Sequence, residues 1–90
     1  MSTAKQWSVQ IFIDEHDDDR THAQARLVIE GETRLVGDGY ARRNPHDRDV
    51  PEIGDEIAAA RALSALAGRL LGTAAGDIED ATGESAALQG

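Results

Sequence analysis

The 90-residue chain contains no cysteine. This excludes a disulfide scaffold, a thiolate zinc site and a cysteine nucleophile. No run of about 18 apolar residues is present, so the sequence predicts no membrane-spanning helix. Residues Met1 to Gln6 are polar and lack the apolar segment of a signal peptide. We therefore expect a soluble, cytoplasmic protein.

Positive charge is also scarce. Nine Lys and Arg residues stand against 17 Asp and Glu residues, which gives a formal net charge of −8. Both halves are acidic, because residues 1–49 carry 7 basic and 10 acidic side chains (−3) and residues 50–90 carry 2 and 7 (−5). Such a chain has no global attraction for RNA, DNA or an anionic membrane.

Alternating apolar residues predict three β-strands at about residues 7–14, 21–30 and 34–42. An acidic loop, residues 14–19, separates the first two strands, and Gly31 marks a tight turn before the third. The short links favour an antiparallel meander. Gly37 and Gly39 lower the surface of the third strand, which lets a helix approach closely.

A long helix is expected from about Pro51 to Leu71, because Pro51 suits the first helical position and Gly72 is a natural stop. A short helix is expected over residues 77–82, and residues 83–90 are expected to fray. We expect the long helix to bury its apolar stripe, which comprises Ile53, Ile57, Ala60, Leu63, Ala67, Leu70 and Leu71. Arg61 and Arg69 are expected to point away from it.

These elements predict an α+β fold in one domain, residues 1–90, with an ordered core at about residues 6–82. A chain of this size buries only about 60–65% of its unfolded surface, so oligomerisation would enlarge a modest core. The helix is expected to cover the sheet face that carries Trp7, Val9, Ile11, Ile13, Ala25, Leu27, Ile29, Leu35 and Ala41.

The alternate residues of these strands, on the sheet face that the helix is not expected to cover, include four apolar side chains among arginines. If they meet, they form a patch typical of an interface, and a homodimer is its simplest use. The alternative is four single apolar residues on a solvated face. The predicted dimer-interface residues are Phe12, Val28, Val36 and Tyr40.

No pattern in the sequence predicts catalysis or a bound cofactor. The three histidines, His16, His22 and His46, lack metal-ligand spacing, and no serine has the context of a nucleophile elbow. Gly37-Asp38-Gly39 lies in a predicted strand and opens no helix, so it is not a phosphate loop. We expect a protein that is not an enzyme and that binds no metal, cofactor or small-molecule substrate.

Five arginines are the candidates for contact with nucleic acid. Arg42, Arg43 and Arg48 lie near the junction of the third strand and the helix, where guanidinium groups could contact phosphates. Pairing with the neighbouring Asp47 and Asp49 is the alternative. Arg26 and Arg34 complete the set on the outer parity of the sheet.

Four stretches of the sequence resemble a family of small actinobacterial proteins of unknown function. They are residues 7–16, 35–45, 47–56 and 60–64, and the resemblance covers about residues 7–82, with 44–56 its most specific part. The resemblance implies a fold related to double-stranded-RNA-binding domains. It also implies kinship with mycobacterial dormancy proteins induced by hypoxia and nitric oxide, one of them a homodimer shaped like a ribosome hibernation factor. No catalytic residue is established for the family.

Two hypotheses follow from these observations. The first is a non-enzymatic stress or dormancy protein that acts as a homodimer and has the ribosome or its rRNA as a candidate partner in translational shutdown. The second is a dimeric module that binds another protein and does not contact nucleic acid. An rRNA-binding protein normally has a basic stripe, whereas this chain is acidic. A similar fold does not by itself imply RNA binding.

Overall fold

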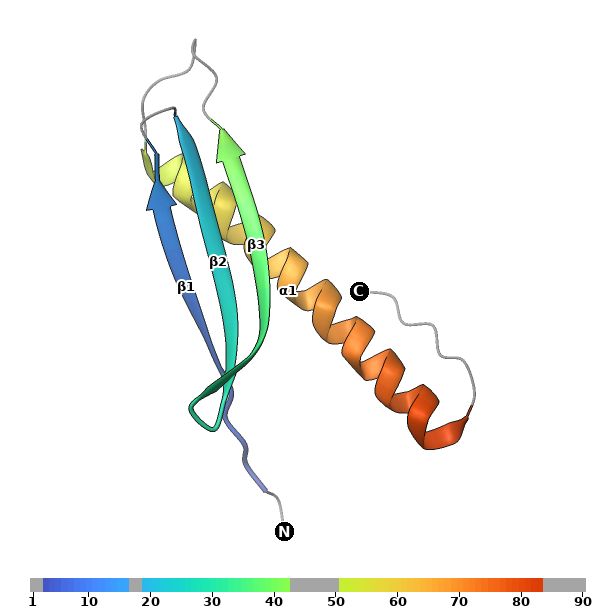
Figure 1. Cartoon of the computed structure of the whole chain (residues 1–90). Coiled ribbons are helices and arrows are strands. Elements are labelled where there is room, and N and C mark those ends of the chain that lie inside the picture. The colour runs from blue at the N-terminus through green and yellow to red at the C-terminus, as the bar shows by residue number, and fades with distance from the viewer. Residues whose placement is uncertain (1–2, 17–18, 43–50, 84–90) are drawn as a thin grey trace.

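The computed structural model describes residues 3–16, 19–42 and 51–83. Three strands, β1 (Ser8–Glu15), β2 (Arg20–Ile29) and β3 (Glu32–Arg42), form an antiparallel sheet in the order β1-β2-β3. One long helix, α1 (Pro51–Thr82), crosses one face of this sheet diagonally, as Figure 1 shows. The predicted α+β class, the three-stranded antiparallel sheet and the long helix are confirmed.

The hairpin between β2 and β3 turns at Glu30 and Gly31, whose φ angles are 53° and 81°. Two successive positive φ angles are typical of the tight turns that match the twist of antiparallel strands. The register then slips, so that Leu27 faces Leu35 while Val28 faces Thr33. Arg34 is therefore the extra residue of a β-bulge. Simple alternation, which placed Arg34 beside Val36 on the outer face, does not hold across this point.

The helix is continuous, so the expected stop at Gly72 and the separate short helix over residues 77–82 are both wrong. A glycine inside a helix costs only about 1 kcal/mol relative to alanine and does not end the helix by itself. The helix ends at Gly83, which has a φ of 72° and donates its N–H to the Glu79 carbonyl at 2.7 Å. This is the left-handed cap typical of helix C-termini.

The helix lies directly on the glycines of β3. A Cβ atom built at Gly37 would come within 2.6 Å of the Ala62 carbonyl oxygen, and one at Gly39 would clash with the backbone of Ala58 and Ala62. Because the backbones approach so closely, only small side chains fit between them. The buried core comprises Ala23, Ala25, Leu27, Ala41, Ala58, Ala62 and Leu66.

The side of the helix that faces the sheet differs from the prediction. Ala58 and Ala62 are fully buried, whereas Ile53, Ile57 and Leu63 of the predicted stripe are 53%, 40% and 41% exposed. The larger side chains would hold the helix away from the glycines of β3, so the row of alanines packs against the sheet instead. Arg61 also differs from the prediction, because its guanidinium donates to the Tyr40 carbonyl oxygen at 2.6 Å.

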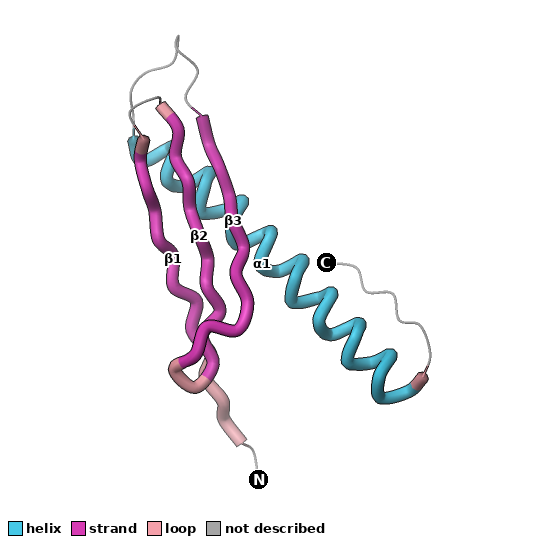
Figure 2. The backbone as a smooth tube through the Cα atoms, in the orientation of Figure 1, coloured by secondary structure: helices cyan, strands magenta, loops and turns pink. Residues whose placement is uncertain are grey.

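The helix contacts β1 far less than β2 and β3, and it leaves most of β1 uncovered. Val9, Ile11 and Ile13 share the inner face with the buried Leu27, Ala25 and Ala23, as predicted, because the register pairs them. Together with Trp7 they nevertheless remain 41–52% exposed. Figure 2 shows the reason, since α1 begins beside the end of β1, then runs behind β2 and β3, and its C-terminal part extends past the sheet.

Candidate functional site

The outer face of the sheet, opposite α1, carries a network of polar and aromatic side chains. Tyr40 of β3 stacks on His22 of β2, with ring centroids 4.7 Å apart and an interplanar angle of 23°. His22 Nε2 lies 2.8 Å from Asp38 Oδ1. These contacts form because the register places His22 opposite Tyr40 and diagonally across from Asp38, which lies two residues before Tyr40 on the same face.

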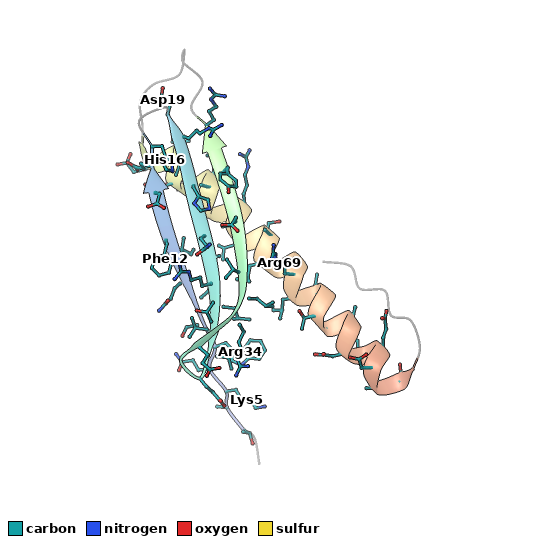
Figure 3. The ribbon with its side chains drawn as sticks, viewed as in Figure 1. Lys5, Phe12, His16, Asp19, Arg34 and Arg69 are labelled. Atoms are coloured by element: carbon teal, nitrogen blue, oxygen red, sulfur yellow. The ribbon has the colours of Figure 1, made fainter. Side chains whose placement is uncertain are left out.

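The same network continues toward β1. Gln24 Nε2 donates to Asp38 Oδ1 at 3.3 Å, and Arg26 Nε donates to Gln24 Oε1 at 2.7 Å. The guanidinium carbon of Arg26 then lies 4.2 Å from the centre of the Phe12 ring, a cation–π contact. Figure 3 shows Phe12 on β1. These side chains therefore form one connected row that joins all three strands, and we call this polar row the outer row.

Asp38 is the electrostatic centre of the row. The hydrogen bond from His22 is the main cause that lowers the pKa of the Asp38 carboxyl below its ordinary value of 3.8. Partial burial opposes this shift, while the Gln24 hydrogen bond and the charges of His22 and Arg69 add to it. Asp38 is thus held as a carboxylate that accepts from two β2 side chains.

The four predicted dimer-interface residues are all on strands of the sheet, but they do not merge into one apolar patch. Phe12 and Tyr40 are exposed, and Val28 and Val36 are half-buried. The polar row that runs through His22 and Gln24 separates Phe12 from Tyr40. Their use in a dimer remains a prediction.

The predicted arginine cluster is dispersed in the described part of the chain. Arg26 is held by Gln24 and Phe12, and Arg34 pairs with Glu32 at 3.5 Å. Arg42 is exposed at the opposite end of β3 from Arg34, which Figure 3 labels. Arg43 and Arg48 lie outside the described residues.

A second surface, which the sequence reasoning missed, is the inner side of β1. We call Trp7, Val9, Ile11 and Ile13 the β1 stripe. Its residues were expected in the core, but they form an open apolar row beside the buried part of the sheet. β1 is also an edge strand, and all eight of its residues are exposed. The available signal was the small size of the helix side chains that meet the sheet, which implies a narrow contact.

Within residues 3–16, 19–42 and 51–83, no group of three or more His, Asp or Glu side chains is placed to hold a metal ion. His22 belongs to the outer row, His16 donates its backbone N–H to the Arg20 carbonyl at 2.8 Å, and His46 lies outside these ranges. Over the same ranges, no helix combines the length and apolar character needed to cross a membrane.

Comparison with known proteins places this fold among mycobacterial relatives. Residues 5–87 match a family model described as Rv2632c-like. The uncharacterized proteins Mb1767 of Mycobacterium bovis and MT1780 of Mycobacterium tuberculosis are each 54% identical over 82 residues, which cover 91% of this chain and 85% of theirs. The uncharacterized protein Rv2632c of Mycobacterium tuberculosis is 47% identical over 78 residues, which cover 87% of this chain and 82% of that protein.

A solved structure supports the same relationship. The chain is similar to the crystal structure of Rv2632c with a TM-score of 0.80 and 44% sequence identity. The match covers 92% of this chain and 96% of that one. Sequence and fold therefore agree over almost the whole length of both proteins.

Proposed function

Because the chain belongs to the Rv2632c-like family, we propose that it is a non-enzymatic, stress- or dormancy-associated protein that acts as a homodimer, with the ribosome as a candidate partner. The association with dormancy rests on the resemblance of residues 7–82 to an actinobacterial family with dormancy-associated members. The observation that carries the homodimer is the exposed edge strand β1.

An open edge with apolar side chains is a surface that a stable protein normally covers. Residues 8–13 of β1 contain no charge and no proline, the two devices that usually protect an edge strand. The β1 stripe exposes further apolar surface beside it. A second strand paired with β1 would satisfy its outer backbone groups and shield part of the β1 stripe.

A second copy of the chain supplies such a strand by symmetry. Antiparallel pairing of β1 with the same strand of another copy is an isologous contact, which closes as a dimer with β3 of each copy at the outer edges. It joins two three-stranded sheets into one. Phe12 lies near the middle of β1, so pairing about that point brings the two Phe12 rings together on the outer face.

This arrangement differs from a dimer made by the outer face alone. Both place Phe12 in the interface. Only the outer-face arrangement also requires Tyr40, which lies on β3 at the other side of the sheet. We favour pairing through β1 because the polar row already occupies the centre of the outer face.

The oligomeric state tests this proposal. Light scattering at tens of micromolar protein should give the mass of a dimer for the wild type, and Ile11→Asp and Phe12→Asp should shift it toward the monomer. Tyr40→Asp, which places the same charge away from β1, should leave the dimer intact. A monomeric wild type would refute the homodimer, and dissociation by Tyr40→Asp but not by Ile11→Asp would move the interface to the outer face.

Ribosome contact is the less supported part of the proposal. Arg42 is exposed at the end of β3, and Arg43 follows it in the chain. The alternative, a dimeric module that binds a protein without nucleic acid, is supported by the net charge of −8 and by the contacts that hold Arg26 and Arg34.

Co-sedimentation with 70S ribosomes separates these two functions. Phosphate contacts predict binding that falls steeply with added salt and is lost when Arg42 and Arg43 are both changed to Ala. Binding that resists salt and survives the double substitution would indicate a ribosomal protein as the partner. No co-sedimentation at low salt would sink the ribosome proposal and leave the protein-binding module.

A further inference from the structure

The outward side of α1 carries a regular seam, apolar except for Ser64, whose members are not part of the buried core. Its members follow one another at alternating spacings of four and three residues. They are Ile53, Ile57, Ala60, Ser64, Ala67, Leu71, Ala74 and Ile78. Most of these residues are exposed, and Leu71 and Ala74 are half-buried. We call this set the α1 seam.

The spacing of the α1 seam is that of a helix that packs lengthwise on another helix. A 4–3 repeat keeps one row of side chains facing a partner helix over several turns. The row spans residues 53–78, which corresponds to about 39 Å at 1.5 Å per residue. The protein's own core does not account for it, because the sheet contacts the opposite side of α1 through Ala58, Ala62 and Leu66.

The electrostatics of α1 indicate what kind of helix would fit. At 100° per residue, Glu52, Glu56 and Asp77 lie along one edge of the α1 seam. Neither arginine of the helix lies beside this edge: Arg61 donates to the Tyr40 carbonyl oxygen, and Arg69, three residues after the buried Leu66, falls on the side of α1 that faces the sheet. The seam is therefore bordered by negative charge that these arginines do not neutralise.

We propose that the α1 seam docks a basic amphipathic helix of another protein. Apolar side chains at three- and four-residue spacing would pack between Ile57 and Leu71, where the alanines of the seam permit close approach. Lysine or arginine side chains beside them would pair with Glu56 and Asp77. This binding surface is separate from β1 and goes beyond the proposed function.

A second copy of the chain fits this seam poorly. Antiparallel pairing of two α1 helices about the middle of the seam would bring Glu56 near Asp77 of the other copy. Parallel pairing would set the acidic edge of each copy against the opposite edge of the other, whose arginine, Arg61, already donates to the Tyr40 carbonyl oxygen. The antiparallel arrangement places like charges together in an interface, which opposes association, and the parallel arrangement offers the acidic edge no additional arginine or lysine of α1. The charge pattern therefore favours a basic partner over self-association.

A designed peptide tests the proposal without knowledge of the natural partner. The probe is a fluorescent helical peptide of about four heptads, with leucine at the two seam positions of each heptad and lysine beside them. A peptide of the same composition in scrambled order is the control for simple charge attraction. Fluorescence anisotropy at about 0.15 M salt should show saturable binding of the ordered peptide to the full-length protein and much weaker binding of the scrambled one.

Two substitutions on α1 locate the contact. Ala67→Asp puts a charge in the middle of the seam and should weaken binding on the order of tenfold or more. Thr73→Asp adds the same charge on another side of the helix and should change binding far less. Circular dichroism of both variants checks that α1 remains helical.

Reversal of the acidic charges along the edge of the α1 seam gives the decisive comparison. The double variant with Glu56→Lys and Asp77→Lys should lose preference for the lysine-flanked peptide and prefer an otherwise identical glutamate-flanked one. Equal binding of ordered and scrambled peptides, or equal binding by Ala67→Asp and the wild type, would overturn the proposal. So would a change of oligomeric mass in Ala67→Asp, because a second copy would then occupy the seam.

The outcome is independent of the β1 dimer. Ile11→Asp should become monomeric and still bind the ordered peptide. If the wild type is monomeric but binds the peptide as described, the proposed homodimer fails and the helix-docking surface stands.

Discussion

Gly37 and Gly39 determine how closely α1 approaches the sheet. A Cβ atom at Gly37 would lie 2.6 Å from the Ala62 carbonyl oxygen and 2.8 Å from the Leu66 Cα atom. These are backbone atoms, so they cannot relieve the clash by a change of rotamer. The missing side chains are therefore the reason that a row of alanines can form the core.

We expect Gly37→Ala to destabilise the protein by about 1–3 kcal/mol, because the added methyl group forces the helix off the sheet. The measurement is the free energy of unfolding in urea. Gly68→Ala is the matched control, since a Cβ there meets nothing within 4 Å and alanine should stabilise the helix by about 0.5–1 kcal/mol. A Gly37→Ala protein as stable as the wild type would contradict the close contact.

The Asp38 carboxylate makes the outer row sensitive to acid. Its folded-state pKa is lowered, chiefly by the His22 hydrogen bond. A carboxyl group whose pKa is lowered in the folded state stabilises the folded protein at pH values above the ordinary pKa of 3.8. This stabilisation disappears as the pH falls through the folded-state pKa. Because the Asp38 side chain is 38% exposed, solvent screening keeps the contribution under about 1 kcal/mol.

Asp38→Asn should therefore be less stable than the wild type near neutral pH, and the difference should shrink below the ordinary aspartate pKa. Urea unfolding at a series of pH values measures it. Asp14→Asn, which changes another exposed carboxylate on the same sheet, is the control. A difference between Asp38→Asn and wild type that persists unchanged in strong acid would argue against the ionised carboxylate as its source.

The strands and the start of α1 could be predicted from the sequence, but the buried face of α1 could not. Alternation located the three strands, and Pro51 marked the start of α1. The face of α1 could not be deduced, because the helix has both an alanine row and a row of larger side chains. Burial of the larger row is the ordinary expectation. Gly37 and Gly39 of β3 reverse this expectation, because the close approach of the helix there leaves room only for the alanine row.

The outer row was missed for a similar reason. The partners of His22 depend on the register between β2 and β3. Counting back from the turn at Glu30 and Gly31 would pair His22 with Gly39, but the bulge at Arg34 moves the pairing to Tyr40. An irregularity of one residue thus decides which side chains meet, and alternation does not reveal it.

The end of α1 provides a test at this scale. Gly72 is helical and open to an added Cβ, whereas Gly83 holds the left-handed cap at a φ of 72°. Gly72→Ala should stabilise the protein by about 0.5–1 kcal/mol and Gly83→Ala should destabilise it by about 1 kcal/mol. Urea unfolding and helical circular dichroism measure both. Stabilisation by Gly83→Ala, or loss of helix in Gly72→Ala, would contradict the continuous helix that ends at Gly83.

At the scale of the whole molecule, the small core and the open surfaces belong together. Among the described residues, no large side chain is fully buried. Two apolar surfaces, the β1 stripe and the α1 seam, remain uncovered on different sides. We assign the β1 stripe to a second copy of the chain and the α1 seam to a basic helix of another protein.

Amide hydrogen exchange of β1 directly tests whether this strand pairs with a second copy of the chain. If β1 pairs with a second copy, the outward N–H groups of residues 8–15 exchange slowly at dimer concentrations. The same amides should lose protection on dilution and in Ile11→Asp, while β2 amides stay protected. Fast exchange of the outward β1 amides in a sample that light scattering shows to be dimeric would contradict the account.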